Sequence, residues 1–298
     1  MKLDGIVTFV KVAEAGSLSE AARRLNLAKS VISDRLMELE RTLGTSLIHR
    51  TTRKLTLTED GAAFLERAVR IAADIEDTVA DMAERRGKLA GPLRLSAPVT
   101  FGRLHLGPAV YPFLTMNPDI ELTLDLDDRR ADAAADGFDA VIRNGAIEDS
   151  RLIAWKLAPS RRVLVASPAY LEIYGAPKAI EDLEVHRGIF YTNRGAADWR
   201  FTRQKRAVTV RSKIGLRVNN GDLIRDAAIA GLGIALLPSF IANEAVKSSA
   251  LRVLDIGASA EPEFIYIAHA EGRQPSTKLR ALADHLRKAF GDPPYWDR

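Results

Sequence analysis

The 298-residue chain contains no cysteine, and this absence excludes several kinds of chemistry. Without cysteine there is no disulfide, no thiolate metal site and no cysteine nucleophile, and the composition fits a reducing cytoplasm. Long apolar runs are also missing: nothing approaches the ~20 residues that a transmembrane helix needs. The charged N-terminal residues 1–16 lack the apolar core of a signal peptide. We therefore expect a cytoplasmic protein with no membrane partner.

The motifs of common enzymes and metal sites are missing as well. The five histidines are scattered without metal-ligand spacing, and no P-loop or G-x-S-x-G sequence occurs. Asp125, Asp127 and Asp128 could suggest paired carboxylates, but the arginines that follow them indicate a solvated, ion-paired turn. The G-x-G at 231–233 has the wrong order for a dinucleotide fingerprint and fits a helix C-cap. The sequence predicts no enzyme, no cofactor and no metal site.

What is present is an ordinary globular composition in a chain long enough for two or three domains. Hydrophobic residues make up 47% of the chain and charged residues 28%. The net charge of +4 is too small to identify a partner, so the placement of charge carries the information.

Residues 17–41 have the pattern of two short amphipathic helices joined by a tight turn. Ser17 and Glu20 have the S-x-x-E spacing of a capping box, in which the Glu side chain returns to the cap. The second helix begins near Lys29, and four apolar residues form its buried face: Ile32, Leu36, Leu39 and Leu43. Its outward face carries mostly polar residues: Ser30, Ser33, Asp34, Met37 and Arg41. The pair matches a helix-turn-helix, whose second helix enters the major groove. An ordinary helical hairpin within a core is the alternative.

The flanking residues favour the DNA-binding interpretation. Apolar residues at helical spacing between 9 and 13 predict a third helix behind the pair. The basic stretch 49–54 precedes the β-prone residues 55–57, as in the wing of a winged helix. Residues 1–58 contain ten cations and six anions, a net charge of +4, with four of the cations at the wing and the start of the second helix. Cations placed there would neutralise DNA phosphates; for any single one, a solvated basic face is the alternative.

The segment 9–61 resembles the DNA-binding domain of the LysR-type transcriptional regulators. The likeness runs without a gap through AEAGSLSEAA, the Ile32-Ser33 pair, LMELERTLG and RTTRKLTLTEDG. It continues through GPLRLSAPVTFGRLHL, APSRRVLVASPAYL, NNGD and AGLGIALLP, which resemble the effector-binding domain of the family. The resemblance implies a sequence-specific transcriptional regulator. Its implied partners are double-stranded DNA, a small-molecule effector, further copies of the chain in a dimer or tetramer, and RNA polymerase.

The outward face of the second helix and the resemblance together assign nine residues to DNA contact: Lys29, Ser30, Ser33, Asp34, Arg35, Met37, Arg50, Thr51 and Arg53. Two of them depart from the family pattern. Asp34 stands where the family usually has a basic residue, so it either accepts from a cytosine amino group or is held back by Arg35 or Lys29. Lys29 stands where the family often has glutamine, which favours guanine or phosphate contact over adenine.

A long helix is expected after Thr58, a predicted N-cap, up to Gly87. Its apolar residues recur at alternating steps of three and four, as in a coiled coil: Leu65, Ala68, Ala72, Ile75, Val79 and Met82. Between 59 and 87 four cations face eight anions, so this surface would avoid DNA. We favour dimerisation through this helix, which would place two recognition helices about one DNA turn apart. A helix packed on its own chain is the alternative.

From Pro92 onward strand-like and helix-like segments alternate, which predicts an α/β region with mainly parallel sheets. The predicted strands are 93–97, 121–126, 140–142, 162–166, 189–192, 208–210, 214–218, 234–237 and 264–268. The predicted helices are 101–116, 168–174, 221–231, 238–247 and 276–290. The resemblance implies the fold of periplasmic binding proteins, with two subdomains joined by crossover strands near 158–163 and 264–269.

The expected fold is therefore an N-terminal winged helix-turn-helix with a linker helix, followed by a C-terminal α/β domain of two subdomains. The DNA-binding domain is expected at 1–58, the dimerisation helix at 59–87 and the effector-binding domain at 91–298. Within the last, subdomain I comprises 91–160 and 268–298, and subdomain II comprises 161–267.

Three turns that follow strands and open helices are candidates for an effector site, because ligands in open α/β sheets bind there. They contribute seven predicted contacts: Ser96, Thr100, Phe101, Arg143, Asn144, Asn220 and Asp222. Arg143 could hold a carboxylate bidentately, so a small organic acid is the predicted effector. In the alternatives, Thr100 and Asn220 only cap helices and Arg143 pairs with a structural Asp.

Two other classes of protein would each explain part of the chain. A solute-binding transport component would explain the C-terminal region, but the missing export signal and the N-terminal unit argue against it. A nucleoid protein that binds DNA without regard to sequence would explain the N-terminal unit, but the effector-like region argues against it.

Overall fold

The computed structural model describes residues 2–50, 55–84, 88–129, 137–145, 147, 149–194, 199–272 and 274–298, without the side chains of residues 50, 73, 74, 76, 77 and 79–84. The chain divides into two compact units, residues 1–92 and 93–298, and each is described by itself. Among the described residues, no helix has the length and apolar character needed to cross a membrane.

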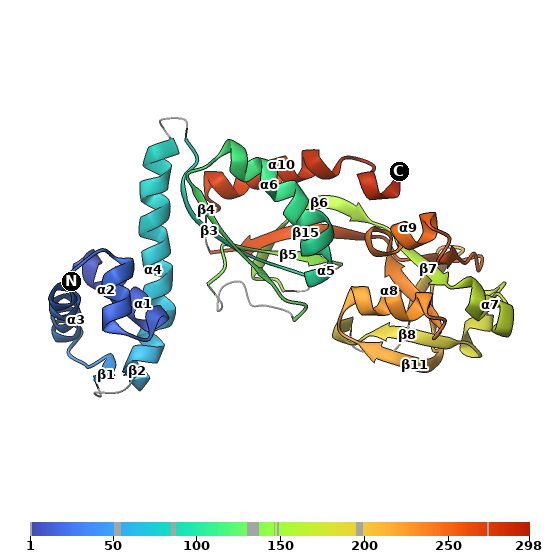
Figure 1. Ribbon diagram of the computed structural model, residues 1–298, viewed down its shortest axis with the longest axis horizontal. Helices are drawn as coiled ribbons and strands as arrows, with labels where there is room; N and C mark the ends of the chain where they lie inside the picture. Colours follow the sequence, from blue (N-terminus) through green and yellow to red (C-terminus); the bar gives the residue numbers. More distant parts are fainter. Residues whose placement is uncertain are drawn as a thin grey trace. The chain divides into compact units, whose positions relative to one another are not determined.

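The first unit is a three-helix core with a two-stranded hairpin and one long helix (Figure 1). Its elements are α1 Leu3–Ala15, α2 Leu18–Arg24, α3 Lys29–Leu43, β1 Ile48–Arg50, β2 Leu55–Leu57 and α4 Glu59–Glu84. Ile6, Phe9, Ile32 and Leu36 meet in the core and are at most 1% exposed. Strands β1 and β2 pair antiparallel, which confirms the predicted wing hairpin, while its residues 51–54 lie outside the described residues.

The prediction that Leu43 is buried in the core of the first unit is wrong. Leu43 is 36% exposed, whereas Ile32, Leu36 and Leu39 are buried as expected. Helix α3 ends at Leu43, and Gly44 takes a left-handed conformation as its C-cap. Leu43 is the last residue of the helix, so it stands at the end of the buried face rather than within it.

The second unit contains two five-stranded sheets, which define two subdomains. The first sheet has the order β4-β3-β5-β15-β6, with β3 Gly91–Ala97, β4 Ile120–Leu126, β5 Ala140–Asn144, β6 Leu152–Ser160 and β15 Glu263–Ala270. The second has the order β11-β8-β12-β7-β13, with β7 Arg162–Ala166, β8 Arg187–Tyr191, β11 Lys213–Val218, β12 Ile234–Pro238 and β13 Arg252–Val253. A small sheet of β9 Trp199–Arg203, β10 Arg206–Val210 and β14 Ser259–Ala260 completes the second subdomain.

Helices cover both sheets (Figure 1). The first subdomain has α5 Val99–Phe101, a π-helical turn η1 Gly102–Leu106, α6 Gly107–Met116 and α10 Thr277–Phe290. The second has α7 Pro168–Tyr174, α8 Gly221–Ile229 and α9 Ser239–Lys247, with short 3-10 turns η2 Ile180–Glu184 and η3 Thr192–Arg194. A last turn, η4 Tyr295–Asp297, packs on α9. The helix predicted over 101–116 is thus one helical stretch with a π-helical insertion, a feature common at functional sites.

The sheets are mixed, so the expectation of mainly parallel sheets is wrong. Strands β3 and β5 are parallel, but β15 is antiparallel to both β5 and β6. In the second sheet β8 runs parallel to β11 and β12, whereas β7 is antiparallel to β12. Strands β7 and β15 enter their sheets directly from the other subdomain rather than through a crossover helix, so they run in the opposite direction.

The chain passes between the subdomains at Arg161 and again at residues 261–262. The first link agrees with the crossover predicted near 158–163. The second precedes the predicted range 264–269, which lies inside β15. All of β15 pairs within the first sheet, so the division predicted between 267 and 268 falls within a strand.

Candidate functional site

Helix α3 presents an exposed, mostly polar face that is held in place by its buried one. Lys29, Ser30, Asp34 and Arg41 are exposed, and Met37 is 47% exposed. Ser33 is half-buried. A face of this kind can approach base edges, because its side chains combine hydrogen-bonding groups with one flexible apolar residue.

The entry to α2 is capped only partly in the predicted way. Ser17 Oγ accepts from the Glu20 backbone N–H at 3.4 Å. The Glu20 carboxylate does not return to the cap; it accepts from Arg24 Nε at 3.0 Å and also pairs with Arg23. The hydrogen bond from Arg24, with the charge of Arg23, lowers the pKa of Glu20. Two arginines one turn away outcompete a single backbone N–H, so the capping box is incomplete.

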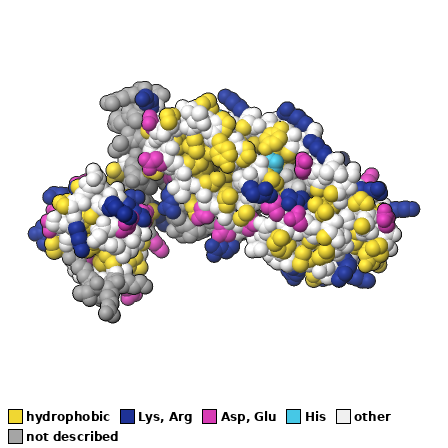
Figure 2. All heavy atoms as spheres, in the orientation of Figure 1, with side chains coloured by type: hydrophobic (Ala, Val, Ile, Leu, Met, Phe, Trp, Pro, Cys, Tyr) yellow, Lys and Arg dark blue, Asp and Glu magenta, His cyan; other side chains and the backbone are white. Residues whose placement is uncertain are grey.

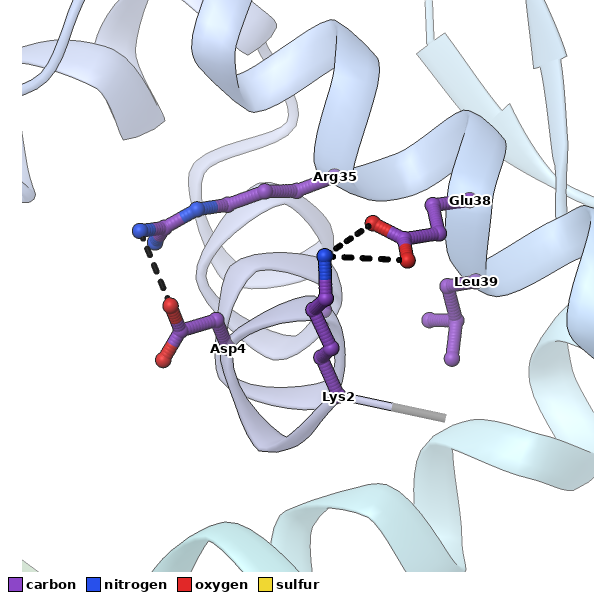
Figure 3. A pocket seen from close by; sticks show the side chains of 6 residues that line it. Lys2, Asp4, Arg35, Glu38 and Leu39 are labelled. Atoms are coloured by element: carbon purple, nitrogen blue, oxygen red, sulfur yellow. Dashed lines mark hydrogen bonds and ion pairs between the residues drawn. The ribbon is translucent and has the colours of Figure 1, made fainter.

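Arg35 does not restrain Asp34, contrary to one of the two predicted roles of Asp34. Its guanidinium forms an ion pair with Asp4 of α1 at 3.0 Å, and Lys2 pairs with Glu38 at 3.2 Å beside it (Figure 3). Asp34 is exposed, and within the described part of the chain it has no ion-pair partner. The two bridges fasten the N-terminal end of α1 to α3, so Arg35 contributes to the position of the recognition helix.

Two features that join α3, the hairpin and α4 were missed from sequence. Glu40 Oε1 accepts from the backbone N–H of Leu47 at 2.8 Å and of Ile48 at 3.3 Å, which ties α3 to the start of the hairpin. A Cβ on Gly61 would stand 2.0 Å from the carbonyl oxygen of Leu47, so only glycine allows α4 to pass this close. Neither residue stands out in the sequence, since Glu40 lies near the end of one helix and Gly61 in the first turn of the next, and neither belongs to a recognisable motif.

Helix α4 uses part of its heptad stripe within its own unit. Thr58 caps the helix as predicted, accepting from the Gly61 N–H at 2.9 Å. Ala68 is 0% exposed and Ala72 is 7% exposed, because both pack against the core formed with α1. These two positions therefore follow the alternative of a helix packed on its own chain. Leu65 and Ile75 are half-buried, and the side chains of Val79 and Met82 lie outside the described ones.

In the second unit, hydrogen bonds join the two subdomains at the predicted effector turns. Thr100 Oγ1 donates to Asp222 Oδ2 at 3.0 Å, and Arg103 donates to Asp222 Oδ1 at 2.8 Å. In the opposite direction, Asn220 Nδ2 donates to Asp128 Oδ2 at 3.0 Å. Each subdomain thus supplies one carboxylate to donors on the other. Acidic and basic side chains intermingle between α5 and α8 in Figure 2.

We call this set of inter-subdomain bonds the carboxylate latch and define it by Thr100, Arg103, Asp128, Asn220 and Asp222. Both carboxylates are also held within their own subdomains: Asp128 Oδ1 accepts from the Val99 N–H at 3.0 Å. Asp222 accepts from Arg225 Nη1 at 2.9 Å. Hydrogen bonds to charged groups are the stronger ones, so the latch stabilises the arrangement of the two subdomains seen here.

Three other predicted effector residues lie at the ends of β3 and β5. Ser96 is 1% exposed and its Oγ has no hydrogen-bond partner among the described residues. Asn144 Oδ1 is likewise buried without a partner there. Arg143 Nη1 donates to the carbonyl of Ile142 at 2.7 Å. Buried polar atoms without partners are costly, and a ligand or water at this place would satisfy them.

The charge of Arg143 also bears on its alternative role as a structural partner. The pKa of Asp127 is lowered chiefly by the hydrogen bond from the Arg129 side chain, with a smaller contribution from the Arg143 charge.

Phe101 does not line a cleft, contrary to its predicted role. It is 1% exposed and packs edge-on against Phe240, Phe290 and Trp296 with centroid distances of 5.2, 5.6 and 6.1 Å. In the helical turn after β3, the side chain of Thr100 faces α8, whereas that of Phe101 packs into this aromatic cluster. Sequence position alone did not distinguish the two.

The aromatic cluster bridges the subdomains at a second place. Trp296 of η4 is 4% exposed and contacts His105 at 4.7 Å between ring centroids. His105 Nδ1 lies 2.7 Å from the Tyr295 hydroxyl, and its Nε2 lies 3.0 Å from the carbonyl oxygen of Phe240 on α9. The residues after α10 thus pack between helices of both subdomains.

The second unit should lose stability in acid in part through His105. Burial disfavours the charged ring and lowers the pKa of His105 below its ordinary value of 6.5, against a smaller opposite effect of the Phe240 carbonyl. The unfolded chain binds this proton more readily, so the contribution is present above about pH 6.5 and is lost as the pH falls through the folded pKa. Melting temperatures measured across that range should depend less on pH in His105→Gln than in the parent or in the exposed control His49→Gln. Equal slopes in all three proteins would contradict this.

Comparison with known protein families covers both units. The model of the bacterial regulatory helix-turn-helix protein, lysR family, matches residues 3–62. The model of the LysR substrate binding domain matches residues 86–291. Together they span most of the chain.

Curated relatives and solved structures agree with these matches. PtxR, an HTH-type transcriptional regulator of Pseudomonas aeruginosa, is 31% identical, with 99% of this chain and 95% of that protein covered. PgrR of Escherichia coli is 34% identical over 95% of this chain and 96% of its own length. The structure of CrgA, a LysR-type transcriptional regulator from Neisseria meningitidis, has a TM-score of 0.61 and 27% identity, with 97% and 99% of the two chains covered.

Proposed function

The chain belongs to the LysR family of bacterial transcriptional regulators, whose members bind DNA and small-molecule effectors and form oligomers, and we propose a specific mechanism for it on that basis. The protein acts in the cytoplasm as a dimer, or as a tetramer of paired dimers, bound to an operator. A small organic acid in the cleft of the second unit alters its contact with RNA polymerase.

The observation that carries the DNA-binding part of the proposal is the exposed face of α3. Lys29 and Ser30 lie at the N-terminal end of this helix, the end that contacts base edges in helix-turn-helix proteins. Ser33, Asp34 and Met37 continue the same face toward the groove. Arg50, Thr51 and Arg53 of the hairpin are proposed to contact phosphates beside it. Selection of binding sites from a random duplex pool, followed by footprinting, tests sequence-specific binding; uniform protection of unrelated duplexes would contradict it.

Replacing Asp34 by alanine should relax base preference without strong loss of affinity. The Asp34 carboxylate is exposed and is proposed to accept from a cytosine amino group, which offsets its repulsion from phosphate. Affinity for the selected operator and for operators substituted at single positions should be measured by fluorescence anisotropy. One position should lose about 1–3 kcal/mol of discrimination in Asp34→Ala. An unchanged preference at every position would exclude base recognition by this side chain.

Dimerisation is proposed to use the part of α4 that the first unit leaves available. Leu65 and Ile75 keep exposed surface in the single chain, and the heptad spacing continues to Val79 and Met82. Ala68 and Ala72 are excluded from this interface, because α1 already covers them. The seam would therefore be concentrated in the second half of α4.

The effector is proposed to act on the carboxylate latch. A ligand carboxylate near Ser96 and Arg143 would accept from the Ser96 hydroxyl and the Arg143 guanidinium, and it would compete with Asp222 for Thr100. Asn144 Oδ1 is itself an acceptor, so a donor group of the ligand or a water would have to satisfy it. Such a ligand can shift the subdomains only if it binds the open and closed arrangements with different affinities. LysG from Corynebacterium glutamicum, solved with bound effector Arg, shares the fold at 19% identity and a TM-score of 0.59. We propose an organic acid as the effector because the predicted effector turns of this chain present hydrogen-bond donors that could bind a carboxylate.

Replacing Asp128 by asparagine should open the second unit. The amide keeps one acceptor oxygen, so its NH2 group would face one of the two donors, Val99 N–H or Asn220 Nδ2, and the charge would be lost. Breaking hydrogen bonds to a charged group costs about 1.5–3 kcal/mol, enough to shift the closed-to-open ratio about tenfold. Because the chain lacks cysteine, spin labels at Thr115→Cys on α6 and Glu172→Cys on α7 report the separation of the subdomains. The distance distribution should broaden or lengthen in Asp128→Asn and stay unchanged in the exposed control Asp125→Asn; an unaltered distribution in both would contradict the latch.

A further inference from the structure

A cavity of about 450 Å³ lies beside the two links that join the subdomains. One wall is formed by residues 159–164, which contain the link at Arg161, and another by residues 258–264, which contain the link at 261–262. The remaining wall comes from the second subdomain. None of the residues of the carboxylate latch lines this cavity. Its size falls within the range of small-molecule sites in proteins.

The cavity is walled chiefly by apolar side chains. Four of these are at least 95% buried: Leu164, Phe201, Leu236 and Ile256. Ala258 and Ala260 are half-buried, and Val253 is 50% exposed at the rim. Both links and residues of seven strands (β6, β7, β9, β12, β13, β14 and β15) thus provide a preformed surface for an apolar molecule.

The polar groups of the cavity restrict the charge of its ligand. Arg162 and Glu263 lie opposite one another with a nitrogen–oxygen distance of 3.7 Å, and their side chains are only 13% and 12% exposed. Arg162 Nη2 also donates to the carbonyl of Leu236 at 2.8 Å. Since this positive and negative charge balance, a charged ligand would break a buried pair and leave one member uncompensated.

One buried group points to a ligand with a single polar atom. Ser160 is 0% exposed and lines the cavity, and its Oγ has no hydrogen-bond partner among the described residues. A buried hydroxyl without a partner costs free energy, which a ligand donor or acceptor would recover.

We propose that this cavity, which we call the hinge site, binds a neutral, mainly apolar small molecule carrying one hydrogen-bonding group. The aromatic or alicyclic part of the ligand packs on Phe201, Leu236 and Ile256. Its polar atom bonds Ser160 after a small shift of the groups that cover this hydroxyl, because Ser160 is 0% exposed without a ligand. Rotation of one subdomain relative to the other moves residues 159–164 and 258–264, so the two arrangements offer different walls. A ligand at the hinge site therefore binds them unequally, which is the condition for shifting their ratio.

The fluorescent probe 1-aminoanthracene tests the hinge site, because it is uncharged at neutral pH, largely apolar and carries one amino group. Titration of the full chain should give saturable fluorescence with about one probe bound per chain. Ala258→Trp places a large side chain at a half-buried position in the cavity wall, and Val253→Asp places a charge at the exposed rim. Each should weaken probe binding at least tenfold, and Ser160→Ala about threefold to tenfold. Ala169→Trp, at an exposed position on α7, is the matched control and should bind as the parent does.

Non-saturable fluorescence in the parent would overturn the site. So would a probe affinity of Ala258→Trp and Val253→Asp equal to that of the parent. Circular dichroism of each variant identifies one that fails to fold, and the other variant then decides. The link to subdomain closure rests on the proposed latch and has its own measurement: Asp128→Asn should change probe affinity at least threefold, since the couplings are reciprocal. If Asp128→Asn bound the probe with the affinity of the parent, the coupling to the latch would be refuted, but the hinge site itself would not. No part of this experiment uses DNA, so its failure is distinct from a failure of the proposed function.

Discussion

Reversing the charge at Lys29 should remove most of the DNA affinity of the protein. Lys29 is exposed at the first position of α3, and the proposed mode of binding brings this end of the helix against the major groove. A glutamate there replaces a favourable contact by repulsion from phosphate or from a guanine acceptor. We expect the affinity of Lys29→Glu for the selected operator to fall about tenfold to a hundredfold. The salt slope of binding should decrease by about one unit.

The slope separates direct contact from indirect damage. Titrations by fluorescence anisotropy at several salt concentrations give affinity and slope together. Lys288→Glu makes the same charge change at an exposed site on α10 and serves as the control. It should alter both quantities little, because long-range effects are screened beyond about 10 Å at 0.1 M salt. If Lys29→Glu and Lys288→Glu behaved alike, or if the slope did not change, α3 would not be the DNA-contacting helix.

Replacing Trp296 by alanine should produce the largest loss of stability in the second unit. The indole ring is 4% exposed and contacts Phe290 at 5.3 Å and His105 at 4.7 Å between centroids. Its Nε1 makes no hydrogen bond within the described residues, so the loss is one of packing. Truncating a buried tryptophan to alanine leaves a cavity, and this loss of packing lowers the free energy of unfolding by about 3–5 kcal/mol.

The same substitution should also loosen the two subdomains, because Trp296 lies between elements of both. Its carbonyl oxygen accepts from Asn243 on α9, while its ring packs on α10. Urea unfolding followed by far-UV circular dichroism measures the free energy, and the labelled pair on α6 and α7 measures the separation. Trp155→Ala, on the half-exposed edge strand β6, is the matched control, with an expected loss of about 1 kcal/mol. A loss at Trp296 no greater than at Trp155 would show that the aromatic cluster does not hold the unit together.

Local patterns predicted the elements of this protein well where periodicity was strong. The recognition helix begins at Lys29, and the expected helices at 168–174 and 276–290 lie within one residue of those observed. Helical spacing of apolar residues reflects burial on one face, and this chain obeys it. The strands missed were β6, β9, β13 and β14. Strand β6 lies at the edge of its sheet with exposed residues at 153, 154 and 156, so it lacks the apolar run that identified β7 and β12.

Roles of the site residues that depend on neighbours in the sequence were predicted, whereas roles that depend on residues far along the chain were not. Asn220 caps α8 as its position indicates, accepting from the Leu223 N–H at 3.1 Å. Its second bond, to Asp128, joins residues 92 positions apart and has no sequence signature. Phe101 was assigned to the cleft because it adjoins Thr100, yet residues far along the chain surround it. Ala68 and Ala72 fit a heptad seam equally well whether α1 or a second chain covers them.

By itself, the sequence determined most of the inward-facing residues and most of the helices and strands, because hydrophobic spacing and turn residues act over a few positions. It also determined the family, through ungapped motifs in both units. Only the tertiary structure decided which carboxylate meets which donor, which aromatic residue fills the core and where a cavity forms beside the hinge. These depend on contacts between residues far apart in the chain, and no local pattern encodes the partner of a side chain across such a distance.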